Sequence, residues 1–227
     1  MNIWILIGIA IFLFSFMTFV RKWHDYTMLF AIAIGFAVNA NIYNSATNPV
    51  YLGDIVFAID SILYMGFTFT VLICAKDYSI KQAIVLTTSA VIAILISAGI
   101  ELFAQISSDG YQKEFIQTFF SYLFSALGTA LGMSVLLFIF SKLKDKLNVY
   151  LLFIICAIVA NLINSSIYYI FSFIIYGRTE NIGYILLGSF IGKAFAIILG
   201  LISYFVNCHW WIPNDLKNKN NENLEAL

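Results

Sequence analysis

Two charged residues lie inside apolar stretches of this sequence, and their chemistry needs an explanation. Lys193 lies about midway along residues 182–205, and Asp60 lies nine residues into residues 51–75. A charge at the centre of a membrane-spanning helix costs about 2.5–3.5 kcal/mol on insertion scales, so it is usually paired, hydrated or in contact with a ligand. An acid and a base could bind opposite edges of a polar solute, or they could form a pair that serves structure alone.

The two charges lie at similar expected depths, about 13–17 Å from the same membrane surface at 1.5 Å per helical residue. We therefore expect Asp60 and Lys193 to share a cavity or to form a pair. If residues 51–75 form one helix, three- and four-residue spacing places Phe57 and Tyr64 on the same face as Asp60. Aromatic rings beside a carboxylate could stack on a planar solute.

Amide side chains add to this polar set. Asn161 and Asn164 share a polar face of residues 149–176 with Ser165 and Tyr168, and Asn41 lies near the end of residues 27–43. Such groups turn inward in lipid, where no water satisfies them, so they predict either solute contact or hydrogen bonds between helices. The candidate substrate-binding residues are Asp60, Tyr64, Phe57, Asn161, Asn164, Lys193 and Asn41.

Small residues recur at four-residue spacing in two of the apolar stretches. Gly188, Gly192, Ala196 and Gly200 form a strip beside Lys193, while residues 115–141 contribute Ser121, Ser125, Gly128, Thr129 and Gly132. Strips of this kind allow close approach of a neighbouring helix, so we expect them to serve packing.

No catalytic motif is present. The sequence has no GxSxG, P-loop or dinucleotide fingerprint, and its three cysteines and two histidines form no metal-ligand spacing. We therefore expect no enzyme activity, no metal and no cofactor. Because the chain has no nucleotide-binding motif, any transport would depend on a gradient or on a separate ATPase.

The elements that must position these residues are apolar helices. The chain has 227 residues, of which 62% are hydrophobic and 11% charged, far fewer charges than in soluble domains. We predict an all-α, polytopic membrane bundle of about seven transmembrane helices in one domain, residues 1–213, with a polar and disordered cytoplasmic tail, residues 214–227. The predicted spans are residues 3–20, 27–43, 51–75, 82–104, 115–141, 149–176 and 182–205.

Orientation follows from the basic residues. Nine of them lie in or beside the loops after the first, third and fifth spans, or in the tail. They are Arg21, Lys22, Lys76, Lys81, Lys142, Lys144, Lys146, Lys217 and Lys219. The opposite side has Lys113 and Arg178. The positive-inside rule then predicts an external N-terminus and a cytoplasmic C-terminus, in a bacterial-type cytoplasmic (inner) cell membrane.

Four short segments resemble the VUT family of vitamin-uptake-like and queuosine precursor transporters. They are Ala40-Asn41-Ile42, the charged loop at residues 76–83, the basic exit at residues 140–144, and Lys193 in the last span. The resemblance covers roughly the second to the seventh span and implies uptake of a 7-deazapurine precursor of queuosine. The chain is similar to a divergent member, because Leu72, Leu136 and Asn164 occupy positions where that family carries carboxylates, and Ser203 one where it carries proline.

Three functions fit these observations. The first is uptake of a small polar, heteroaromatic solute. The second is a substrate-binding subunit that passes solute to an ATPase module docked on small residues such as Ala33, Ala37, Ala126 and Ala130. The third is a non-transporting assembly or immunity protein, whose polar residues serve packing. The expected partners are the lipid bilayer, a small-molecule solute, and a second copy or an ATPase; no nucleic acid is expected.

Overall fold

The computed structural model describes residues 8, 11–12, 15–16, 26–46, 50–52, 55–57, 59–109, 113–176 and 182–210. Most of the first predicted span, residues 3–20, and the tail, residues 214–227, lie outside them. The elements are α2 (Tyr26–Ala46), β1 (Val50–Leu52), β2 (Ile55–Phe57), α3 (Ile59–Asp77), α4 (Ile80–Asp109), α5 (Lys113–Leu143), α6 (Val149–Tyr176) and α7 (Ile182–Trp210).

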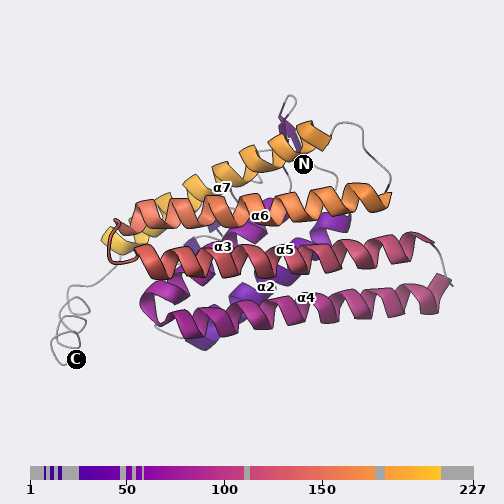
Figure 1. Ribbon diagram of the computed structural model, residues 1–227, viewed down its shortest axis with the longest axis horizontal. Helices are drawn as coiled ribbons and strands as arrows, with labels where there is room; N and C mark the ends of the chain where they lie inside the picture. The colour runs from indigo at the N-terminus through magenta and orange to yellow at the C-terminus, as the bar shows by residue number, and fades with distance from the viewer. Residues whose placement is uncertain are drawn as a thin grey trace.

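The helices form two layers. In Figure 1, α4, α5 and α6 lie side by side in front, α7 crosses obliquely beyond α6, and α2 and α3 lie behind. Short connections between consecutive helices make neighbours antiparallel, which is why α4 packs on α5, and α5 on α6.

Helix α3 is the centre of the bundle. It contacts all the other described helices, and every residue from 62 to 75 is buried. The two threonine hydroxyls in its buried part donate within the helix, Thr68 to the Tyr64 carbonyl at 2.9 Å and Thr70 to the Gly66 carbonyl at 2.7 Å. This helix can therefore be buried on all sides without leaving those hydroxyls unsatisfied.

The composition and surface of the bundle are those of a membrane protein. Among the described residues, three helices are long and apolar enough to cross a membrane, namely Ile80–Ala104, Phe119–Leu143 and Val149–Phe171. Their outer faces expose large apolar side chains, including Ile96, Phe138 and Leu162. Such surfaces are unfavourable in water but are expected beside lipid, so the predicted helical membrane bundle is confirmed at this level.

The predicted helix at residues 51–75 is wrong in its first third. Residues 50–52 and 55–57 form the two antiparallel strands of a hairpin, in which Val50 pairs with Phe57 and Leu52 with Ile55, and α3 begins at Ile59. Both strand sequences are rich in β-branched and aromatic residues, and Gly53-Asp54 separates them, a two-residue spacing typical of hairpins. Phe57 therefore does not share a helical face with Asp60.

The small-residue strips bring helices together, as expected. A Cβ atom added at Gly132 of α5 would lie 2.8 Å from the Ala160 carbonyl oxygen of α6, and one at Gly128 would lie 3.1 Å from the Asn164 carbonyl oxygen. On α7, a Cβ at Gly200 would lie 2.7 Å from the Phe69 ring of α3. The absence of side chains at these positions sets the spacing between helices.

Candidate functional site

A small polar cavity lies among five helices of the bundle. Its volume is about 20 Å³, which is room for about one water molecule. It is lined by Ala40 and Asn41 of α2, Asp60 and Tyr64 of α3, Ser125 of α5, Asn164, Tyr168 and Tyr169 of α6, and Lys193 of α7. Five of these residues are among the candidates predicted from the sequence: Asn41, Asp60, Tyr64, Asn164 and Lys193.

Lys193 is the cationic residue that lines this cavity, and only 4% of its surface is exposed. Its ammonium group donates to the Ser165 hydroxyl at 2.5 Å and lies 5.0 Å from the centroid of the Tyr64 ring. The Ser165 hydroxyl in turn donates to the Asn161 side-chain oxygen at 3.1 Å. A hydrogen-bonded chain thus connects α7 with α6, while a cation–π contact connects α7 with α3.

Asp60 lines the cavity from a different place in its helix than the sequence predicted. It lies in the first turn of α3, where the helix dipole stabilises a carboxylate, and not well inside a longer helix. Its carboxylate lines the same cavity as Lys193 and interacts with that residue electrostatically. The shared cavity therefore results from a helix end that meets the middle of α7, and not from equal depths along two long helices.

The three candidate amides have different roles in the structure. Asn164 lines the cavity and donates to the Thr129 hydroxyl at 3.2 Å, which connects α6 with α5. Asn41 lines the cavity and donates to the carbonyl oxygen of Ala37 at 2.8 Å, within its own helix. Asn161 is buried and accepts a hydrogen bond from Ser165, so it positions the hydroxyl that the Lys193 ammonium group contacts.

Several residues of the site were missed from the sequence. Ser165 and Tyr168 lie on the predicted polar face of α6 but were not chosen, and Ser125 was attributed to helix packing. Tyr169 follows Tyr168 directly, and their rings lie 5.2 Å apart. A tyrosine pair next to a run of buried amides was the available signal. The Phe57 side chain lies outside the described part of the structure.

Away from the cavity, α3 and α7 meet again near their C-terminal ends. The Lys76 ammonium group donates to the Tyr204 hydroxyl at 2.7 Å and lies 5.5 Å from the centroid of that ring. The Tyr204 ring packs against Phe153, at 5.2 Å between centroids, and Phe153 against Phe69 at 6.2 Å. Buried aromatic side chains therefore fill the space between the cavity and this end of the bundle.

The chain matches no protein-family model, no curated protein and no solved structure. Its resemblance to the VUT family therefore stays a prediction.

Proposed function

We propose that this protein is a multi-pass membrane transporter that takes up a small polar solute through the cavity beside Lys193. The observation that supports this most strongly is a buried ammonium and a carboxylate on one cavity, together with amides. Ionisable groups are costly inside a membrane protein, and they commonly mark a substrate or ion pathway.

The groups around the cavity fit a planar, hydrogen-bonding solute. Lys193 offers donors, Asp60 offers acceptors, and Asn164 offers both. Tyr64, Tyr168 and Tyr169 offer aromatic faces, which can stack on a heteroaromatic ring. A 7-deazapurine of the kind implied by the family resemblance has edges and faces of this type.

Uptake of such a solute requires movement of the helices. A cavity of about 20 Å³ is far below the roughly 300–1,000 Å³ of ligand pockets, so the described conformation is occluded. The Lys76–Tyr204 hydrogen bond and the aromatic packing around Phe153 close the side toward the C-terminal end of α3. We expect α3 and α7 to separate alternately at their two ends.

The alternative of an ATPase-dependent subunit keeps one partly exposed residue among its four proposed docking residues, the half-buried Ala130. Ala33, Ala37 and Ala126 are buried inside the bundle, where they cannot contact a partner. Because the sequence has no nucleotide-binding motif, uptake needs a gradient or a separate ATPase, and we propose a gradient because three of the four docking residues are buried. The proposed topology has seven spans, an external N-terminus and a cytoplasmic tail.

Purified protein tests the proposal in two steps. The first is a thermal-shift screen against nucleobases, deazapurines and vitamins, in which a ligand that binds the folded state raises Tm. The second is uptake of the identified ligand into proteoliposomes that contain this protein alone. Saturable uptake supports the proposal. Binding without uptake would support a subunit that needs an ATPase, and the absence of binding would support a non-transporting protein.

A double variant links uptake to the cavity. Asp60 and Lys193 interact electrostatically across one cavity, so removing one charge leaves the other uncompensated in a buried site, whereas replacing both removes that cost. Asp60→Asn combined with Lys193→Met should therefore be more stable than either single variant, and inactive in uptake. The matched control is Lys144→Met with Asp145→Asn, which makes the same exchanges in the exposed turn after α5. Native uptake by the cavity variant would contradict a role for this site.

A further inference from the structure

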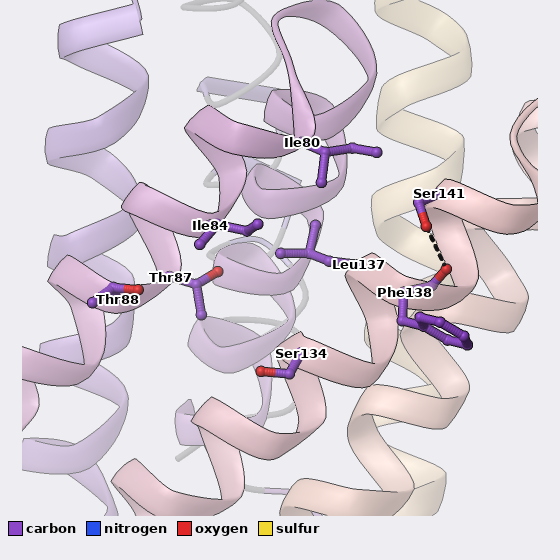
Figure 2. Close-up of a pocket in the computed structure, with 8 residues that line it drawn as sticks. All are labelled: Ile80, Ile84, Thr87, Thr88, Ser134, Leu137, Phe138 and Ser141. Carbon is purple, nitrogen blue, oxygen red and sulfur yellow. Dashed lines mark hydrogen bonds between the residues drawn. The ribbon is translucent and has the colours of Figure 1, made fainter.

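A second hollow lies on the outside of the bundle, between the first turns of α4 and the last turns of α5. It is a groove with a volume of about 380 Å³. Ile84 of α4 and Leu137 and Phe138 of α5 give it apolar walls. Figure 2 shows Leu137 pointing toward α4, with Ile80 and Ser141 toward one end of the groove.

The groove contains a hydroxyl whose hydrogen bond is missing. Thr87 lines the groove with 7% of its surface exposed, and its hydroxyl has no hydrogen-bond partner among the described residues. The two serine hydroxyls that α5 contributes to the groove are satisfied within their helix, because Ser134 donates to the Ala130 carbonyl and Ser141 to the Phe138 carbonyl. A buried donor of this kind favours a ligand that brings an acceptor into the groove.

One end of the groove is basic. Lys142 is exposed, and its ammonium group lies 5.9 Å from the centroid of the Phe138 ring, a wall of the groove. Lys81 is also exposed and directly follows Ile80, which lines the same end. An apolar groove that ends in lysines is complementary to a molecule with an apolar chain and an anionic head.

We propose that this groove binds one anionic phospholipid of the surrounding bilayer. An acyl chain lies between Ile84 and Leu137, and the phosphate lies at the helix ends, beside Lys142 and Lys81. Thr87 is seven residues beyond Ile80, on the order of 10 Å along the helix, so its hydroxyl can donate to an ester carbonyl of the lipid. This site is separate from the polar cavity and does not depend on the proposed transport.

Native mass spectrometry of delipidated protein tests the site directly. The protein is titrated with phosphatidylglycerol or with phosphatidylcholine of the same acyl chains. We expect one saturable phosphatidylglycerol adduct and an affinity for phosphatidylcholine that is lower by about tenfold. Equal binding of the two lipids, or several equivalent adducts, would show unspecific lipid and overturn the proposal. A dimer that carries no lipid would assign the groove to a second copy, and would also overturn it.

Two pairs of variants locate the bound lipid. Ile84→Trp fills the groove, whereas Val85→Trp places the same ring on the adjacent residue, which is similarly exposed and does not line the groove. We expect the first to weaken the adduct about tenfold and the second to leave it unchanged. Lys142→Gln should lower the affinity for phosphatidylglycerol about fivefold, and Lys144→Gln should have less effect. Because the tryptophan sites are half exposed, both variants should keep the native Tm; equal adducts in the two would overturn the proposal.

Discussion

The Lys193 ammonium group donates to a neutral hydroxyl, on a cavity that also holds the Asp60 carboxylate. In the proposed transport, Ser165 holds the ammonium group while the Asp60 carboxylate interacts with the solute. Ser165 is itself fixed by Asn161. The polar chain on α6 therefore determines where the ammonium group lies.

The first prediction concerns that chain. Ser165→Ala removes the acceptor of Lys193 and the donor to Asn161, so it should lower the free energy of unfolding by about 1–3 kcal/mol. The measurement is the thermal or denaturant unfolding of purified protein. The control is Ser134→Ala, an exposed serine bonded within its own helix, which should stay within about 0.5 kcal/mol of native stability. Equal effects of the two variants would show that Ser165 does not hold the lysine.

Much of the cavity could be predicted at this scale because polar groups in a membrane protein have few places to lie. Asn41, Asp60, Tyr64, Asn164 and Lys193 were identified as polar or aromatic residues within apolar stretches, although the depth expected for Asp60 assumed a longer helix. The partner that each side chain chooses depends on the rotation of its helix and on its rotamer, which no single sequence specifies. For that reason the contact of Lys193 with Ser165 was not predicted.

The hairpin at residues 50–57 illustrates the limit of sequence analysis at the scale of elements. Residues 51–75 are apolar and long enough to span a bilayer, so hydropathy alone favours one helix. Local signals compete with hydropathy, because strand-forming residues flank the turn-forming pair Gly53-Asp54. The residues from Ile59 onward contain no such pair, and they form the helix. The remaining described helices followed the predicted spans because their apolar runs contain no comparable break.

The second prediction concerns the approach of α5 to α6. Gly132→Ala would place a methyl group 2.8 Å from the Ala160 carbonyl oxygen, and a helix backbone can relieve that contact only by moving. We expect a loss of about 1–3 kcal/mol in the free energy of unfolding. Gly99→Ala is the control, because a Cβ there meets nothing within 4 Å, and it should be neutral or stabilising by up to about 1 kcal/mol. A Gly132→Ala protein as stable as the control would mean that the two helices can separate freely.

The two ends of the whole bundle differ in their content of basic residues, and this difference predicts its orientation in the membrane. Basic residues gather around the loops after α3 and α5, at the same end of the bundle, whereas the hairpin and the start of α7 lie at the other. The positive-inside rule therefore predicts that the hairpin faces outward.

The third prediction follows from this orientation. Single cysteines introduced at Ser45 or Ser108, in a background without Cys74, Cys156 and Cys208, should react with an impermeant thiol reagent added to intact cells. Cysteines at Ser79 or Asn220 should react only after the membrane is opened. External labelling at Asn220 would contradict an odd number of spans with an external N-terminus.

The burial of α3 also has a consequence for the order of biosynthesis. This helix leaves the ribosome after α2 but before α4, α5, α6 and α7, although it contacts all of them. Its surroundings are thus completed only when the last helix has been made. Until then the growing chain has to keep a helix with no lipid-facing side in the bilayer or at the insertion machinery, so α7 is the element whose arrival closes the fold.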